Sequence, residues 1–141
     1  MKALVVHTRS RPSAVSCRRK PTTFSTSWGC RPVFVNVNND MPIAQKEIFG
    51  PVLSVIAYDS EDDAIRIAND SKYGLHAAVI GTDVARARRV ASQLRAGCVV
   101  INNMTDDAQA PWGGFKYSGV GREYGRYGIE AFLETKAILE S

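Results

Sequence analysis

The sequence contains only two histidines and three cysteines among its 141 residues. His7 and His76 form no H-x-x-x-H pair, and no two of Cys17, Cys30 and Cys98 have C-x-x-C spacing. Zinc sites and redox motifs depend on such spacings, so the sequence predicts no metal site. An odd number of cysteines also argues against a disulfide framework and favours a reducing compartment, and we expect a cytoplasmic location.

Long apolar runs and phosphate-binding motifs are also absent. No run approaches the roughly 20 apolar residues of a membrane-spanning helix, so no membrane partner is expected. No G-x-x-x-x-G-K-[ST] loop occurs, and Gly119, Gly121 and Gly125 miss the dinucleotide fingerprint by one residue. These glycines do not lead from a clear strand into a long helix, so we expect them to serve turns and close backbone approach. Hydrophobic residues make up 45% and charged residues 23% of the chain, as in one globular domain.

Acidic residues are missing from the start of the chain. None precedes Asp40, whereas seven of the 18 basic residues do, and the other 11 basic residues accompany all 14 acidic ones. The net charge of +4 therefore belongs to a basic leader, and the remainder is slightly acidic. The seven basic residues of the leader are Lys2, Arg9, Arg11, Arg18, Arg19, Lys20 and Arg31.

Residues 1–30 are rich in Ser, Thr, Arg and Pro and show no helical or strand period, so three interpretations compete. A nucleic-acid-binding arm would have only Phe24 and Trp28 for stacking. An organellar transit peptide would show a clearer amphipathic pattern. We favour a leader that is either disordered or an artefact of a frameshift or a misplaced start, and we expect no nucleic-acid partner.

The chain beyond this leader alternates strand-like and helix-like segments. Apolar residues recur at helical spacing in two segments, the first beginning after Ser60 and the second after Thr82 or Asp83. Strands on either side of such helices predict an α/β fold with a parallel sheet. A strand at the end of the chain would form an edge that invites pairing with another subunit. The strands are predicted at 32–37, at 52–58 (buried), at 75–81, at 98–102 (buried) and at 135–139.

The stretch QKEIFGPV, residues 45–52, places Glu47 and Phe49 two positions apart just before a predicted strand. Extended backbone would point both side chains to one side. Glu47 could then accept hydrogen bonds from a ribose diol, and Phe49 could pack on a flat heteroaromatic ring. Spacing alone favours the simpler alternative, in which Glu47 is a solvated acid and Phe49 fills the core.

Three longer stretches resemble the late catalytic-domain motifs of the aldehyde dehydrogenase superfamily. They are RPVFVNVNNDMPIAQKEIFGPVLSVIAYDSEDDAIRIANDSKYGL, LRAGCVVIN and APWGGFKYSGVGREYGRYGIEAFLETKAI, and they occur in the family's order from about residue 31 to residue 138. The resemblance implies a partial aldehyde-dehydrogenase-like parallel sheet with flanking helices and a C-terminal edge strand. It places the catalytic-domain portion at 31–125 and a helical turn with the oligomerisation strand at 126–141, through which homo- or hetero-oligomers would form.

The resemblance also implies a function, the oxidation of aldehydes to carboxylic acids with NAD or NADP. Glu47 corresponds to the glutamate that hydrogen-bonds the nicotinamide ribose, and Phe49 to the phenylalanine that positions the nicotinamide ring. A loop after the last buried strand lines the aldehyde entrance in the family. Its residues here include Asn102, Asn103, Met104, Thr105 and Asp106.

No catalytic residue is assigned within the chain. The family's nucleophilic cysteine, general-base glutamate and Rossmann domain lie upstream of the matched motifs, and Cys98 stands where the family usually has threonine. We therefore expect a truncated C-terminal fragment that is inactive alone. The alternative is a non-catalytic interaction module that pairs with full-length subunits through its C-terminal strand.

Overall fold

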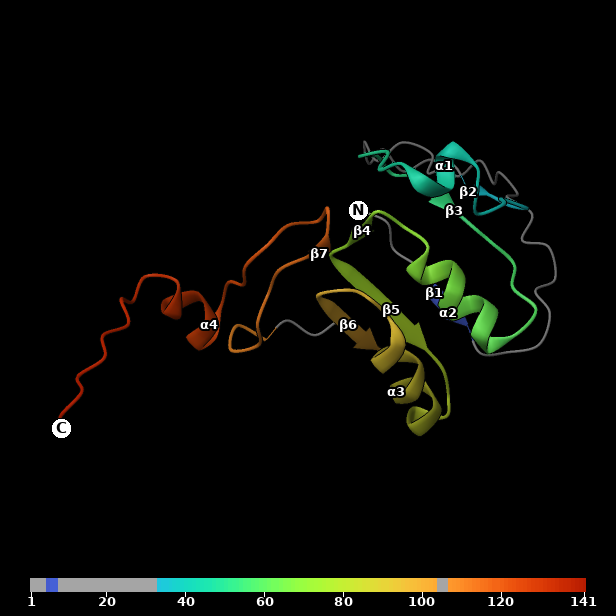
Figure 1. Ribbon diagram of the computed structural model, residues 1–141. Coiled ribbons are helices and arrows are strands. Elements are labelled where there is room, and N and C mark those ends of the chain that lie inside the picture. Colours follow the sequence, from blue (N-terminus) through green and yellow to red (C-terminus); the bar gives the residue numbers. More distant parts are fainter. Residues whose placement is uncertain (1–4, 8–32, 104–106) are drawn as a thin grey trace, which may run out of the picture.

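The computed structural model describes residues 5–7, 33–103 and 107–141 and shows a mixed α/β structure, which confirms the predicted fold class (Figure 1). Its centre is a three-stranded parallel sheet in the order β1-β5-β6, accompanied by a parallel pair, β2 and β3, and an antiparallel pair, β4 and β7. The strands are β1 Val5–His7, β2 Val33–Phe34, β3 Leu53–Ser54, β4 Tyr73–Gly74, β5 His76–Ile80, β6 Cys98–Ile101 and β7 Phe115–Lys116.

β5 and β6 are joined by helix α3 (Val84–Gln93) and form a parallel βαβ unit. The register pairs His76 with Cys98. Of the two predicted caps, Asp83 is the one used, since its carboxylate accepts a 2.9 Å hydrogen bond from the backbone N–H of Arg86. This bond satisfies one of the donors that the first helical turn leaves open.

Helix α2 (Glu61–Asn69) precedes this unit and begins as predicted. The Ser60 hydroxyl accepts a 3.1 Å hydrogen bond from the backbone N–H of Asp63. The first turn contains three acidic residues, which the positive end of the helix dipole favours.

The hydrophobic core lies on one face of the β1-β5-β6 sheet. Ala77 and Val79 alternate with more exposed residues along β5, so their side chains share a face. Both α2 and α3 pack on that face, and Val79 and Val90 are fully buried. The buried cluster consists of Ile65 from α2, Ala77 and Val79 from β5, and Ala87, Val90 and Leu94 from α3 and its C-cap.

Several short elements differ from the predictions, among them β1, β2 and β3. Val5–His7 form β1 beside β5, although no element was predicted within residues 1–30. A three-residue strand is too short to show a period, and it is recognisable only through its partner. The strands predicted at 32–37 and 52–58 shorten to β2 and β3, and Leu53 is exposed rather than buried. In the described part of the chain these two strands pair only with each other, which limits their length.

Two glycines near the starts of the strands lie very close to other main-chain segments. A Cβ atom added to Gly97 would overlap the carbonyl oxygen of Gly113, and one added to Gly74 would lie 2.5 Å from the carbonyl oxygen of Arg95. Only glycine allows main chains to approach so closely. Gly119 and Gly121 instead have positive φ angles of 129° and 80°, as turn residues do.

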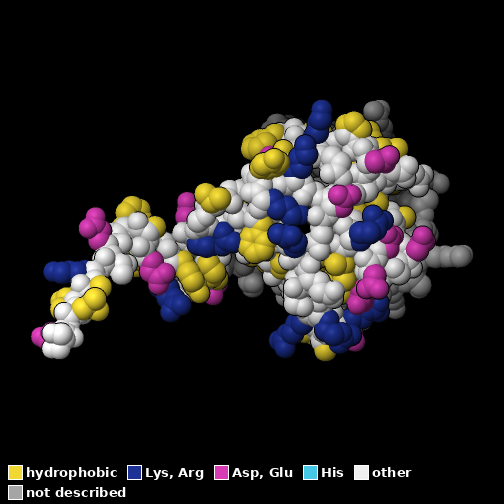
Figure 2. Space-filling view, in the orientation of Figure 1, with side chains coloured by type: hydrophobic (Ala, Val, Ile, Leu, Met, Phe, Trp, Pro, Cys, Tyr) yellow, Lys and Arg dark blue, Asp and Glu magenta, His cyan; other side chains and the backbone are white. Residues whose placement is uncertain are grey.

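The C-terminal part projects away from the body (Figures 1 and 2). Helix α4 (Gly125–Glu130) is followed by an exposed extension, in which Leu139 is 92% exposed. Residues 135–139 were predicted to be a strand, but they have no strand partner within the described residues. A strand needs a neighbour for its backbone hydrogen bonds, so the segment remains an unpaired extension here.

Candidate functional site

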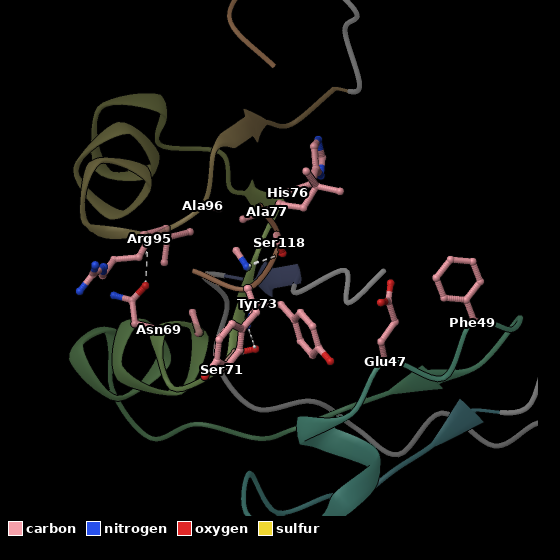
Figure 3. A pocket seen from close by; sticks show the side chains of 15 residues that line it. Glu47, Phe49, Asn69, Ser71, Tyr73, His76, Ala77, Arg95, Ala96 and Ser118 are labelled. Carbon is pink, nitrogen blue, oxygen red and sulfur yellow. Dashed lines mark hydrogen bonds between the residues drawn. The ribbon is translucent and has the colours of Figure 1, made fainter. Parts of the chain in front are cut away.

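The first side of the site is the segment that follows helix α1 (Pro42–Gln45). Lys46 ends the helix in an extended conformation, and the next residues lead to β3. Figure 3 shows the side chains of Glu47 and Phe49 projecting to the same side of this segment. The predicted arrangement of the pair is therefore observed.

Phe49 is not a core residue. Its side chain is 89% exposed, and its φ angle is +56°, in the left-handed region. Bulky residues rarely adopt this conformation, which costs about 1 kcal/mol or more. The fold thus holds an aromatic ring outward in a strained conformation, which excludes the alternative in which Phe49 fills the core.

Glu47 and Phe49 border a hollow of about 360 Å³ (Figure 3). The opposite parts of its lining come from the ends of α2 and α3, the start of β5, and residues 117–118. Small apolar side chains such as Ala68, Ala77 and Ala96 form part of the lining. Its polar part includes hydroxyl groups, a carboxylate, an amide, an imidazole and a guanidinium: Ser71, Tyr73, Tyr117, Ser118, Glu47, Asn69, His76 and Arg95.

The β4–β7 pair forms one wall of the hollow. The Ser118 hydroxyl accepts a 2.9 Å hydrogen bond from the backbone N–H of Gly74. The backbone N–H of Tyr117 donates a 3.0 Å hydrogen bond to the carbonyl oxygen of Lys72. These bonds join residues more than 40 positions apart in the sequence.

Lys116 directly precedes Tyr117, and its side chain reaches the end of α2. Its ammonium donates to the carbonyl oxygens of Asn69, at 2.7 Å, and Ser71, at 2.8 Å. Burial lowers the pKa of Lys116, the neighbouring charge of Arg95 lowers it further, and Asp70 partly opposes both effects. The cation is therefore held in a partly desolvated position at a helix C-terminus, where the dipole favours positive charge.

The predicted aldehyde-entrance residues lie elsewhere. Asn102 and Asn103 follow β6, at the carboxyl end of the parallel sheet, whereas the hollow includes the first residues of β5. The Asn102 side chain accepts a 2.9 Å hydrogen bond from the backbone N–H of Gly81. Met104, Thr105 and Asp106 lie outside the described residues. The structure therefore brings Glu47 and Phe49 together and places the described part of the loop at the other end of the sheet.

No site role was predicted for the wall residues Tyr73, Tyr117 and Ser118 or for their neighbour Lys116. Their signal was present in the motifs KYG and FKYSG, where polar and aromatic residues adjoin glycines. Glycines that permit close approach indicate that their neighbours contact another segment. Which segment they contact depends on tertiary pairing, which spacing does not reveal.

No cysteine is among the described residues that line the hollow. Cys98 is half-buried in β6 and does not line it. Within residues 5–7, 33–103 and 107–141, no group of three or more His, Cys, Asp or Glu side chains could hold a metal ion. In the same ranges, no helix has the length and apolarity to cross a membrane.

Comparison with known proteins identifies the family to which the sequence is similar. The model of the aldehyde dehydrogenase family matches residues 16–138, so the match begins within the residues expected to be an unmatched leader. A Staphylococcus haemolyticus protein named as an aldehyde dehydrogenase is 53% identical over 120 residues, which are 84% of this chain and 25% of that protein. A Staphylococcus aureus homologue is 52% identical over the same length and shares. The chain thus spans about a quarter of the length of the curated relatives it matches.

Solved structures show the same likeness. Aldehyde dehydrogenase C of Pseudomonas syringae, in a mutant form with NAD⁺ and octanal, is 57% identical with a TM-score of 0.73, over 75% of this chain and 22% of that chain. Betaine aldehyde dehydrogenase of Staphylococcus aureus, in complex with NAD⁺, is 48% identical with a TM-score of 0.71, over 74% of this chain and 21% of that chain.

Proposed function

The chain belongs to the aldehyde dehydrogenase family, and from this premise we propose that its 141 residues supply the nicotinamide-contacting wall of an NAD-dependent aldehyde oxidation site. The observation that carries the proposal is the exposed Phe49 ring at φ +56°, beside Glu47 on the same side of the hollow. A strained, outward aromatic ring next to a carboxylate is suited to a ligand that combines a flat ring with a diol.

Each residue has a distinct role in this proposal. The Glu47 carboxylate accepts hydrogen bonds from the two ribose hydroxyls and so fixes the rotation of the sugar. The face of Phe49 packs against the nicotinamide ring and restricts its tilt. NAD, when bound, would supply the hydride acceptor for aldehyde oxidation. The protein residues described here bind and orient the cofactor.

The same proposal limits what these residues do alone. The family resemblance places no nucleophilic cysteine and no general-base glutamate within the 141 residues. Covalent capture of the aldehyde needs an activated nucleophile, so we propose that this chain, tested alone, does not reduce NAD. No residue of the chain is assigned to the phosphates or the adenine of NAD. We therefore expect weak NAD binding, with a dissociation constant on the order of 1 mM.

The test is a titration of the ¹⁵N-labelled chain with NAD, followed by amide chemical shifts. Phe49→Ala removes the ring contact and should weaken binding about tenfold. Glu47→Gln removes the charge from the ribose contact and should weaken it by a similar factor. Phe132→Ala is the matched control for the ring, since Phe132 is also 89% exposed but lies in the C-terminal extension. Glu134→Gln is the control for the charge.

Two results would contradict the proposal. One is equal weakening by Phe49→Ala and Phe132→Ala, which would mean that the hollow does not contact the ring. The other is NADH formation by the 141-residue chain with a simple aldehyde, which would show that the chemistry needs no group beyond these residues.

We also propose that residues 135–139 pair with the sheet of a neighbouring subunit, in a homo- or hetero-oligomer. The exposure of Ile138 and Leu139 supports this assignment, since apolar residues on an unpaired extended segment are a template for strand addition. Sedimentation of the wild type and of Ile138→Asp tests it: the substitution should shift the distribution to smaller species. An unchanged distribution would refute the pairing.

A further inference from the structure

Lys116 combines a strained backbone with two strong contacts. Its φ angle is +56°, the same left-handed value as that of Phe49. A long side chain in this region persists only where surrounding interactions demand it. The contacts that demand it are the hydrogen bonds from its ammonium to the carbonyl oxygens of Asn69 and Ser71.

Those carbonyl oxygens lie at the last residue of α2 and just beyond it, where the acceptors of a helix end need donors. The carbonyl oxygen of Asn69 also accepts a 2.9 Å hydrogen bond from the backbone N–H of Ser71. The side chain of Asn69 adds a second connection, because its amide donates to the carbonyl oxygen of Gln93, and its oxygen accepts from the backbone N–H of Arg95. The ends of α2 and α3 and strand β7 therefore meet at one point, where Lys116 supplies the positive charge.

The neighbours of Lys116 face the hollow. Tyr117 and Ser118 line it together with Glu47 and Phe49. Their own bonds, to Lys72 and Gly74, fix the same short stretch of backbone. Movement of Lys116 away from α2 would therefore displace the wall of the hollow that faces the cofactor segment.

We propose that Lys116 is a positioning residue of the cofactor site: its ammonium holds Tyr117 and Ser118 against the end of α2 and so sets the shape of the hollow in which Glu47 and Phe49 act. The proposal rests on the proposed function for its ligand. The positioning itself rests only on the contacts of Lys116.

The variant Lys116→Met removes the cation and keeps an unbranched side chain. Amide exchange at Gly74 and Tyr117 should quicken about tenfold, because two charge-assisted bonds are lost, whereas exchange at Val79 in the core should change less than about twofold. NAD binding, measured by chemical shift, should weaken about tenfold as the wall loosens.

Two further variants separate positioning from a general loss of structure. Lys136→Met makes the same chemical change at an exposed residue of the C-terminal extension, away from the wall, and should change neither exchange nor binding. Lys116→Arg keeps a cation on a side chain that can still reach the carbonyl oxygens, and should restore both readouts to within about threefold of wild type.

The outcomes are distinct. Equal exchange rates at Gly74 and Tyr117 in Lys116→Met and Lys136→Met, or a uniform rise that includes Val79, would overturn the positioning role. Failure of Lys116→Arg to restore protection would overturn the role of the cation. Faster exchange with unchanged NAD affinity would overturn the link to the cofactor. If the wild-type chain shows no NAD response at all, the proposed function fails, and the exchange data still decide whether Lys116 holds the wall.

Discussion

Gly97 lies where the start of β6 meets two other segments, and replacing it with alanine tests how tightly they pack. Its backbone N–H donates a 2.9 Å hydrogen bond to the carbonyl oxygen of Gly74. A Cβ atom at this position would overlap the carbonyl oxygen of Gly113 and lie 2.7 Å from its carbonyl carbon. The obstacle is the main chain of Gly113 and Gly114, so no side-chain rotation can relieve the overlap.

The expected cost follows from this geometry. Gly97 does not have a positive φ angle, so the backbone conformation itself suits alanine and only the overlap contributes. Extra carbon atoms in packed interiors cost about 1 to 3 kcal/mol, and a rigid main-chain obstacle puts Gly97→Ala near the upper value, about 3 kcal/mol. For a chain of this size the melting temperature should fall by roughly 10 °C.

Urea unfolding followed by circular dichroism measures this change, with Gly50→Ala as the control. A Cβ atom at Gly50 would meet nothing closer than Ile48 Cγ2 at 3.9 Å, which is an ordinary contact. Amide exchange should also show faster opening around Gly113 and Gly114 in Gly97→Ala, since these residues must move. A free energy of unfolding within about 0.5 kcal/mol of the control would refute the close approach.

Two further predictions concern the core and the first turn of α2. Val90→Ala removes two methyl groups from a fully buried position and should lower the free energy of unfolding by about 2 kcal/mol. Val84 lies on the same helix but is 45% exposed, so Val84→Ala should cost much less. Equal costs of the two substitutions in urea unfolding would contradict the placement of α3. The hydrogen bond from Arg66, with a further one from the backbone of Asp59, lowers the pKa of Asp63 below its ordinary 3.8. The folded state therefore favours the carboxylate, so its contribution to stability is present above pH 3.8 and is lost as the pH falls through the lowered pKa. The urea midpoints of wild type and Asp63→Asn should converge over that range, while Asp62→Asn should follow wild type; a constant gap between wild type and Asp63→Asn would contradict the assignment.

The sequence predicted the elements whose signals are local. The caps of α2 and α3 are chemical signals within four residues, Ser60 with Asp63 and Asp83 with Arg86, and both are observed. β5 and β6 were predicted within one or two residues, because β-branched residues adjoin these helices. β4 and β7 were missed, since a two-residue strand exists only through a partner about 40 residues away.

The candidate site also has a part that the sequence predicts and a part that it does not. Glu47 and Phe49 are two positions apart, so their common direction followed from the sequence, although the exposed and strained state of Phe49 did not. The wall formed by Tyr117 and Ser118 could not be predicted, because its hydrogen bonds join it to Lys72 and Gly74, more than 40 positions earlier. Long-range polar contacts of this kind have no periodic pattern in the sequence.

The order of the central sheet has a consequence for how the chain folds. Strand β5 lies between β1 and β6, and its two pairings differ greatly in loop length, since Val5 pairs with Ala78 whereas His76 pairs with Cys98. Closing the longer loop costs more chain entropy, and it gains contacts only after closure. We therefore expect the β5-α3-β6 unit to form the folding nucleus, with β1 added late. Substitutions in α3 should slow refolding, whereas substitutions that weaken β1 should mainly quicken unfolding.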